Sequence, residues 1–433
     1  MRAATRRVDP IDEMIRIVGD SVTDPTHQAN APPAAPRPEI TLTNAAHIDG
    51  PNPMSALIDL SLPVGIRSRH VQIATGLNMH ILEAGEPDGR PLILLLHGFP
   101  ELAYSWRKAM TPLADAGYYV VAPDQRGYGR TTGWDDRFNG DLQSFTISRI
   151  AIDAFALVRA LGMKAAHTIV GHDFGSPIAA WCGLTRPDVF RSCVMMSAPY
   201  RPAPPVGSSR LGTPKFVGGL AELERPRKHY VWYYSTPEAN DDMRNCPQGI
   251  SDFLRAYFHV KSGDWSGNRP FPLQAMTADE LAKLPTYYVM DRDADMAATV
   301  APFMPSSEQV ASCQWMTESD LDFYATEFDR TGFQGGLNWY RCGTVPGVAV
   351  EMELFDGRRL DVPSMFIGGE RDWGIHQTAG ALNAMGTACS DYRGTVLVPG
   401  AGHWVQQEAP DQVLARLLAF MNGRTSVSNP REI

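Results

Sequence analysis

The sequence predicts an α/β fold, a mostly parallel sheet flanked by helices, with a helical cap inserted between two of the sheet strands. Short continuous runs of aliphatic residues alternate with helical patterns over residues 92–196, as expected for parallel strands that are buried on both faces. The alternation then stops over residues 199–347, where no strand pattern is convincing. Two further aliphatic runs and a helix follow, so the sheet resumes after the interruption.

The first part of the core is predicted over residues 70–198, where the apolar periodicity changes repeatedly between strand and helix. Its expected elements, in chain order, are a hairpin at 71–83, a strand at 92–96, a helix at 105–116, a strand at 118–122, a helix at 147–161 and strands at 168–170 and 193–196. Strands that alternate with helices imply crossover connections, which place helices on both faces of the sheet.

The cap is predicted over residues 199–347, which are rich in Pro, Tyr, Trp and Met and contain helical stretches such as 318–329. Residues 348–433 are predicted to complete the core, with strands at 364–367 and 395–398 and a final helix at 412–421. We therefore expect the cap to cover the carboxyl edge of the sheet, where ligands bind in open α/β sheets.

Residues 1–69 are predicted to form an arm outside the core, because prolines cluster at residues 31–38 and such segments resist regular structure. A short helix is expected at residues 11–18. Met54 opens a more ordinary sequence and is an alternative start of the protein.

The composition is that of a soluble globular protein. Of the 433 residues 44% are apolar, which is enough to bury a large core. Lys and Arg total 39 against 48 Asp and Glu, so the net charge of −9 disfavours nucleic acid or an anionic membrane as a partner. No apolar run approaches the ~20 residues of a membrane span. The six cysteines are scattered without a Cys-x-x-Cys pair, which favours reduced thiols and a cytoplasmic protein without a disulfide framework or a zinc knuckle.

A sharp turn with a reactive side chain is predicted at Asp173. Residues 168–176 read TIVGHDFGS, in which a β-branched run meets Gly-x-Asp-x-Gly and then a helical pattern, the context of a nucleophile elbow. Gly171 and Gly175 permit the tight bend. A carboxylate is ionised at neutral pH and attacks an electrophilic sp3 carbon without a base to activate it. The alternative interpretation is that Asp173 only caps the following helix.

Two further candidate residues follow later strands. Asp372 lies in GGERDW after the strand at 364–367, and His403 lies in PGAGHW after the strand at 395–398. The order nucleophile, acid, histidine is that of the α/β-hydrolase fold, so Asp173, Asp372 and His403 are predicted to form a catalytic triad. Glu370 is the alternative acid, although it lies nearer the strand end. His172 is expected to point into the fold and to be structural.

The chain resembles the soluble group of α/β-hydrolase epoxide hydrolases. The motifs that carry the resemblance lie between residues 70 and 422 and are HGFPE (97–101), PDQRGYGR (123–130), GHDFG (171–175), LNWYR (337–341), GGERDW (368–373) and GAGHW (400–404). Each motif is shared with other hydrolases, whereas the combination is specific. The mammalian soluble enzymes of this group carry an additional amino-terminal phosphatase domain, for which residues 1–69 are too few.

The resemblance implies that the backbone N–H groups of Phe99 and Phe174 form an oxyanion hole. It also implies that Phe99, Phe174 and Trp339 contact the substrate and that the Phe99-Pro100 peptide bond is cis.

The resemblance further implies that two cap tyrosines hold the epoxide oxygen. One is Tyr340 in the NWY motif, and the other is Tyr230 in KHYVWYYSTPE at 228–238. Tyr233 and Tyr234 are alternatives for the second position. Simple aromatic packing is the other interpretation of these residues.

The implied reaction converts an apolar epoxide and water to a vicinal diol, without a metal or organic cofactor. Asp173 opens the ring to give a hydroxyalkyl ester, and water activated by the His403–Asp372 pair hydrolyses that ester. The alternative is a haloalkane or haloacid dehalogenase, although such enzymes place Trp or Arg where Phe174 stands. A non-catalytic binding module is less favoured because the three triad residues are intact. Residues 285–315 are expected either to wall the pocket or to join two subunits, which leaves a homodimer open.

Overall fold

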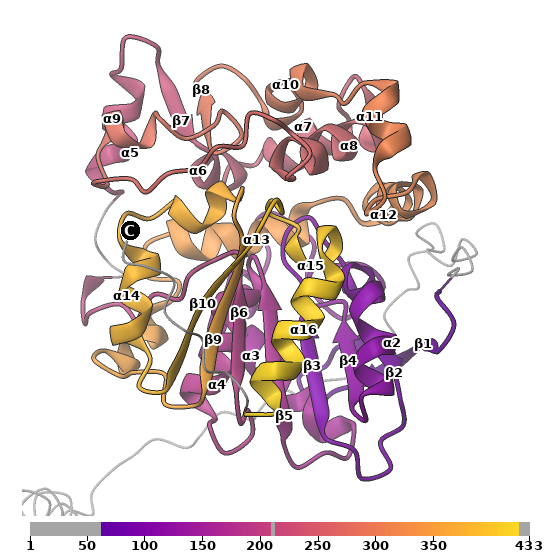
Figure 1. Ribbon diagram of the computed structural model, residues 1–433. Helices are drawn as coiled ribbons and strands as arrows, with labels where there is room; N and C mark the ends of the chain where they lie inside the picture. The colour runs from indigo at the N-terminus through magenta and orange to yellow at the C-terminus, as the bar shows by residue number, and fades with distance from the viewer. Residues whose placement is uncertain (1–61, 209–212, 424–433) are drawn as a thin grey trace, which may run out of the picture. The chain divides into compact units, whose positions relative to one another are not determined.

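Eight strands form one mixed sheet in the order β1-β2-β4-β3-β5-β6-β9-β10 (Figure 1). The strands are β1 (Ile66–Gln72), β2 (Asn78–Ala84), β3 (Leu92–Leu96), β4 (Tyr119–Pro123), β5 (Ala166–His172), β6 (Cys193–Met196), β9 (Ser364–Gly369) and β10 (Tyr392–Val398). Strand β2 is antiparallel to both β1 and β4, and the strands from β4 to β10 run parallel. The predicted mostly parallel sheet is therefore confirmed.

The computed structural model describes residues 62–208 and 213–423. The short helix expected at residues 11–18 and the alternative start at Met54 lie outside these ranges. Strand β1 begins at Ile66 and pairs along its length with β2, so the first strand of the core starts before the predicted boundary at residue 70. The described parts of the chain contain no helix long and apolar enough to cross a membrane.

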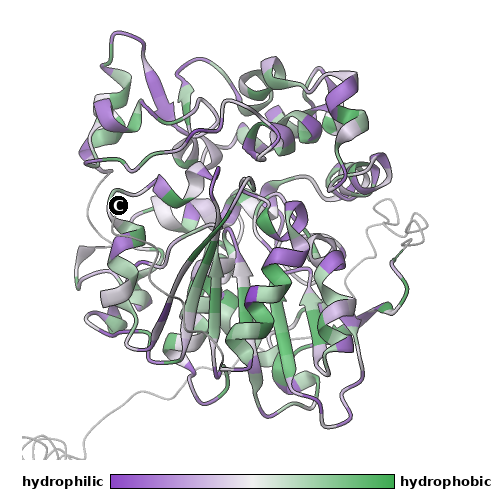
Figure 2. Cartoon of the chain, in the orientation of Figure 1, coloured by the Kyte–Doolittle hydropathy of each residue, from purple (hydrophilic) through white to green (hydrophobic). Residues whose placement is uncertain are grey.

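Four long helices of the core are α2 (Arg107–Asp115), α3 (Ile147–Ala160), α4 (Gly175–Thr185) and α16 (Pro410–Met421). Helix α2 packs against α16, and α3 packs against α4. Figure 1 shows α16 in front of the sheet and α3 and α4 behind it. Every residue of β3, β4 and β6 is buried, because helices cover both faces, and Figure 2 shows the hydrophobic residues concentrated in these central strands.

The insertion, which we define as residues 199–363, is mainly helical. Its α-helices are α5 (Lys215–Ala221), α6 (Tyr230–Tyr234), α7 (Ala239–Arg244), α8 (Gly249–Lys261), α9 (Ala278–Leu281), α10 (Met296–Val300), α11 (Ser307–Ser312), α12 (Glu318–Thr331) and α13 (Gln334–Thr344). It also contains a small antiparallel pair, β7 (Arg227–His229) and β8 (Val289–Asp291). The sequence did not indicate this pair, because three residues are too few to show an alternation.

Buried polar contacts join the insertion to the core. Arg107 forms an ion pair with Asp320 at 2.9 Å, and the hydroxyl groups of Ser105 and Tyr324 lie 2.7 Å apart. The indole N–H of Trp339 donates to the carbonyl oxygen of Arg126 at 3.1 Å. These partners lie far apart in the sequence, and they hold α12 and α13 against the loops at the carboxyl ends of the strands.

Candidate active site

Asp173 lies at the turn between β5 and α4 in a left-handed backbone conformation, with φ of 51°. A Cβ atom on Gly171 would lie 1.9 Å from the carbonyl oxygen of Gly175, so only glycine permits this close approach of strand and helix. Helix α4 has no side-chain cap, and its N-cap residue is Phe174. The interpretation of Asp173 as a helix cap is therefore wrong, and the predicted sharp elbow is present.

The two oxygen atoms of the Asp173 carboxylate have different partners. The backbone N–H of Phe99 donates to Oδ1 at 2.9 Å, while Oδ2 faces His403. No hydrogen bond joins the N–H of Phe174 to this carboxylate in the described part of the chain. The Phe99-Pro100 bond is cis, as the resemblance implies. A Cβ on Gly98 would lie 2.4 Å from Oδ1, so a glycine is needed for the loop to approach the carboxylate.

His403 lies between two carboxylates. Its Nδ1 atom is 3.1 Å from both oxygens of Asp372, and its Nε2 atom is 3.4 Å from Oδ2 of Asp173 without an aligned hydrogen bond. The side chains of His403 and Asp372 are 1% exposed. The alternative acid, Glu370, is exposed and instead accepts a hydrogen bond from the backbone N–H of Gly400 at 3.2 Å. The structure thus brings Asp372 to His403, and the alternative with Glu370 is wrong.

The charges of these three residues depend on one another. Burial disfavours the charged form of His403, but the neighbouring carboxylates outweigh burial and raise its pKa to about 9. Burial also disfavours the ionised form of Asp173, yet its interactions with His403 hold its pKa well below the usual range. At neutral pH the resting site is therefore an imidazolium between two carboxylates.

His172 joins three loops of the site beneath the nucleophile. Its Nδ1 atom is 2.6 Å from Oε2 of Glu101, and its Nε2 atom is 2.7 Å from the carbonyl oxygen of His403. Glu101 also accepts hydrogen bonds from the side-chain amides of Gln406 and Gln407, each at 2.9 Å. The structural role predicted for His172 is confirmed. The role of Glu101 was missed, although this residue is the last position of the HGFPE motif.

Tyr230 and Tyr340 come together above the nucleophile from two helices of the insertion. Tyr230 begins α6, Tyr340 lies in α13, and their ring centroids are 5.8 Å apart. The ring of Tyr340 also lies 5.0 Å from that of Phe174 and 5.5 Å from that of Phe99. Burial, and then the negative charge of Asp173, raise the pKa of both phenols well above the usual value of about 10, so both hydroxyl groups stay protonated.

The two alternative tyrosines of α6 use their hydroxyl groups elsewhere. The hydroxyl of Tyr233 donates to Asp242 at 2.9 Å, and that of Tyr234 donates to Tyr257 at 3.3 Å. These bonds favour Tyr230 as the second tyrosine, a choice that the sequence left open.

Trp339 is 2% exposed, and its ring lies 5.3 Å from that of Phe174. Its indole N–H is occupied by Arg126, so the residue supports Phe174 from behind. A contact between Trp339 and a substrate stays a prediction.

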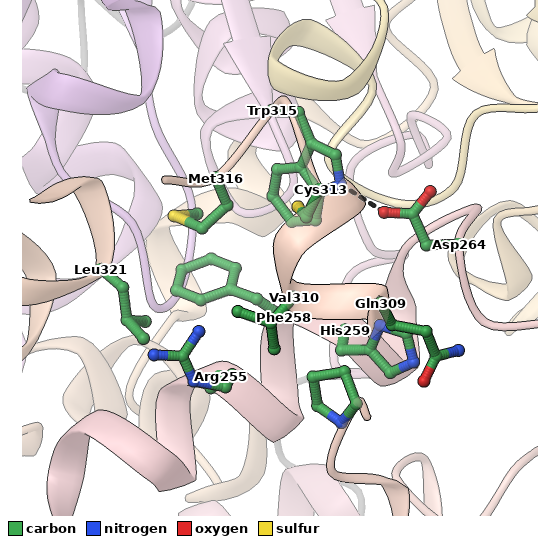
Figure 3. A pocket seen from close by; sticks show the side chains of 11 residues that line it. Arg255, Phe258, His259, Asp264, Gln309, Val310, Cys313, Trp315, Met316 and Leu321 are labelled. Carbon is green, nitrogen blue, oxygen red and sulfur yellow. Dashed lines mark hydrogen bonds between the residues drawn. The ribbon is translucent and has the colours of Figure 1, made fainter. Parts of the chain in front are cut away.

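A separate hollow lies in the insertion, lined by residues of α8, α11 and α12 (Figure 3). Within it, the indole N–H of Trp315 donates to Asp264 at 2.8 Å. None of the residues predicted to be catalytic lines this hollow, so it is distinct from the candidate active site.

Comparison with known proteins agrees with this geometry. The model of the family described as the alpha/beta hydrolase fold matches residues 91–410, and the chain belongs to that family. Epoxide hydrolase A of Mycobacterium tuberculosis is 34% identical over 365 residues, which cover 83% of this chain and 99% of that protein. At this identity and coverage the chain belongs, more narrowly, to the epoxide hydrolases of the family.

Solved structures give the same assignment. An epoxide hydrolase from an endophytic Streptomyces is 32% identical and superposes with a TM-score of 0.68, covering 83% of this chain and 96% of that chain. Epoxide hydrolase I of potato, Solanum tuberosum, is 29% identical with a TM-score of 0.64, covering 83% of this chain and 99% of that chain. The resemblance inferred from the six motifs is confirmed.

Proposed function

We propose that the protein hydrolyses an apolar epoxide to a vicinal diol through a covalent hydroxyalkyl ester on Asp173. One observation carries this proposal: the elbow presents an aspartate whose Oδ1 is held by the N–H of Phe99, while Oδ2 faces His403. A serine at this position would perform acyl transfer, whereas a carboxylate attacks carbon directly. The site is walled by the rings of Phe99, Phe174 and the tyrosine pair, which suits an apolar substrate.

In the first half-reaction, Oδ2 of Asp173 attacks a ring carbon of the epoxide and the carbon–oxygen bond breaks. The oxygen takes a proton from Tyr340 or Tyr230 as it becomes an alkoxide. A phenol with a raised pKa is protonated at the start of this step and is well placed to donate. The products are a neutral ester on Asp173 and one tyrosinate.

In the second half-reaction, the ester is hydrolysed. Ester formation removes the charge of Asp173, one of the two carboxylate charges that hold the proton on His403. The imidazolium therefore loses its proton, and this proton returns the tyrosinate to a neutral tyrosine. Neutral His403, oriented by Asp372, then takes a proton from water, and the hydroxide attacks the carboxyl carbon of Asp173. The N–H groups of Phe99 and Phe174 stabilise the oxyanion, and the imidazolium returns its proton to the departing diol. The carboxylic acid thus left on Asp173 then gives its proton to His403, which restores the carboxylate and the imidazolium of the resting site.

The insertion acts as a cap in this proposal, because α6 and α13 bring the two tyrosines over the nucleophile and exclude water from the site. Every step uses groups of the chain itself, so the proposal includes no metal or cofactor. All six cysteines are free, which supports a cytoplasmic location.

The His403→Gln variant tests the proposal. A carboxylate needs no base for the first attack, so this variant should accumulate a covalent adduct on Asp173, detected as an increase in intact mass equal to the mass of the epoxide. A panel of aryl, alkyl and fatty-acid epoxides should be compared with bromoalkanes. His167→Gln is the matched control, because His167 lies on β5 and bonds its neighbour Thr168, and this variant should turn over without an adduct.

Adducts from bromoalkanes alone would identify a dehalogenase. A His403→Gln variant that stays unmodified with an epoxide that the parent protein consumes would contradict the two-step route.

A further inference from the structure

A buried lysine lies next to the candidate active site and takes no part in the mechanism above. Lys261 is the last residue of α8 and is 4% exposed. Within the described ranges, no carboxylate oxygen lies within 4.0 Å of its ammonium group. A buried lysine is usually paired with a carboxylate, because an isolated ion is costly to remove from water, so its position here requires an explanation.

Aromatic rings surround the ammonium group. Its nitrogen lies 4.9 Å from the ring centroid of Tyr257, 5.0 Å from that of Tyr288 and 5.5 Å from that of Trp404, and it donates a hydrogen bond to the hydroxyl of Tyr257 at 3.2 Å. Cation–π interactions of this kind stabilise a desolvated cation without neutralising it. The aromatic cage therefore supplies the ammonium group of Lys261 with the favourable contacts that a carboxylate partner would otherwise give.

The backbone of Lys261 is fastened to the loop that carries His403. The N–H of His403 donates to the carbonyl oxygen of Lys261 at 2.9 Å, and a Cβ on Gly402 would lie 2.7 Å from the same oxygen. The ring of Trp404, which forms one side of the cage, lies 4.7 Å from the ring of His403. The cage is thus built directly against the proposed base.

The cage also contacts the tyrosine pair. The ring of Tyr288 lies 5.3 Å from that of Tyr230, and Tyr257 accepts a hydrogen bond from Tyr234, whose ring lies 5.0 Å from that of Tyr340. The residues around Lys261 therefore contact both the His403 loop and the tyrosine pair.

The lysine acts electrostatically on all three members of the triad. Burial and the carboxylate of Asp372 have the largest effects on the pKa of His403. The positive charge of Lys261 comes next, and it lowers this pKa. Burial raises the pKa of Asp173 and of Asp372, the interactions with His403 lower both, and the charge of Lys261 adds a smaller lowering to each. The titratable groups that face His403 or Lys261 are those of Asp173, His172, Asp372, Tyr257, Tyr287, Tyr288 and, through His172, Glu101. Glu408 also lies against the loop of His403, where it accepts hydrogen bonds from the N–H groups of Gly402 and Trp404, and burial raises its pKa to about 7.

We propose that Lys261 is a positioning residue for the second half-reaction, whose caged ammonium group allows His403 to lose its proton once Asp173 has become a neutral ester. This inference rests on the proposed function. In the ester, Asp372 would still favour the imidazolium, and Lys261 is the buried cation that offsets Asp372. The ammonium nitrogen lies 5.5 Å from the ring centroid of Trp404, which lies 4.7 Å from that of His403, so the two charged groups are at most about 10 Å apart. At an effective dielectric constant of about 20, a unit charge about 10 Å away shifts such an equilibrium by about 1 pH unit.

The test is the pH dependence of ester hydrolysis in single turnovers, measured by rapid quench and intact mass. The rate of ester hydrolysis should rise with pH as His403 loses its proton. In Lys261→Met the midpoint of this rise should move up by about 1 pH unit, so that ester accumulates at neutral pH. Lys261→Arg keeps the positive charge and should have the parent profile. Lys108→Met is the matched control, because Lys108 also joins the core to the insertion but bonds only backbone carbonyl groups, and it should leave the midpoint unchanged.

A midpoint equal to that of the parent in a folded Lys261→Met variant would overturn the inference while leaving the proposed function intact. If no ester forms in any variant, the proposed function itself fails. The parent protein supplies a second measurement that does not depend on the folding of a variant. Its midpoint should lie well below the value of about 9 for resting His403, and a midpoint near 9 would show that the base is not released as proposed.

Discussion

Replacing the two tyrosines of the site tests whether the protein is built for epoxides. An epoxide oxygen leaves carbon as a strongly basic alkoxide, whereas halide leaves as a stable anion, so only the epoxide reaction needs an acid at the leaving atom. The rings of Tyr230 and Tyr340 are 5.8 Å apart, and the ring of Tyr340 lies 5.0 Å from that of Phe174, the residue that follows the nucleophile, so the two phenols share one wall of the proposed site. General acid catalysis contributes about 10²- to 10⁴-fold.

We therefore expect Tyr230→Phe and Tyr340→Phe each to slow ester formation by about 10- to 100-fold, because the remaining phenol still donates. The double variant should lose the whole contribution, about 10²- to 10⁴-fold or more. The assay is the rate at which Asp173 is alkylated, followed by intact mass with the epoxide in excess. Circular dichroism should show that each variant is folded.

Tyr233→Phe is the matched control from the same helix, because the hydroxyl of Tyr233 bonds Asp242 instead of facing the nucleophile. It should alkylate at the parent rate. A folded double variant that still alkylates near the parent rate would show that Tyr230 and Tyr340 are packing residues, and the assignment of an epoxide substrate would lose its support outside the triad.

Two further predictions concern stability. Gly171→Ala would force a Cβ to 1.9 Å from the carbonyl oxygen of Gly175, so we expect the free energy of unfolding to fall by about 3 kcal/mol or more. Gly386→Ala on α14 (Ala381–Ala388) is the control, because its Cβ meets nothing within 4 Å, and it should raise the free energy of unfolding by about 0.5–1 kcal/mol. Denaturant unfolding measures both variants, and equal effects would contradict the argument that strand and helix approach closely at Gly171. Because the pKa of His403 rises on folding to about 9, its ion pairs stabilise the fold fully below about pH 6.5 and are lost as the pH rises through 9, a change of about 3 kcal/mol. The stability difference between the parent and His403→Gln should shrink over that interval, and a constant difference would refute the assignment.

Much of the core was predictable from the sequence because its signals are local. A strand buried on both faces needs a continuous aliphatic run, and a crossover helix needs apolar residues at helical spacing, so β3, β5, α3 and α16 appear where expected. The elbow is local in part, since Gly171 is required by its contact with the carbonyl oxygen of Gly175, whereas Gly175 itself is required by the carbonyl oxygens of Leu96 and His97 at the end of β3. The order of Asp173, Asp372 and His403 along the chain then indicated the triad.

The remaining choices depended on side chains that are distant in sequence. Asp372, and not Glu370, contacts His403 because the loop after β9 turns Asp372 inward and leaves Glu370 exposed. Neither the register of α6 nor its composition distinguishes Tyr230 from Tyr233, and the distinction comes from Asp242 on the next helix.

The network of Glu101 and the aromatic cage of Lys261 were beyond the reach of sequence patterns for the same reason. Glu101 meets Gln406 and Gln407, and Lys261 meets Trp404, only when α8 and the loop after β10 are brought together by the fold. Local sequence therefore determined where the strands, helices and nucleophile lie, because backbone geometry and burial act over a few residues. Only the tertiary structure decided which charges face one another, because electrostatic partners are set by distance in space.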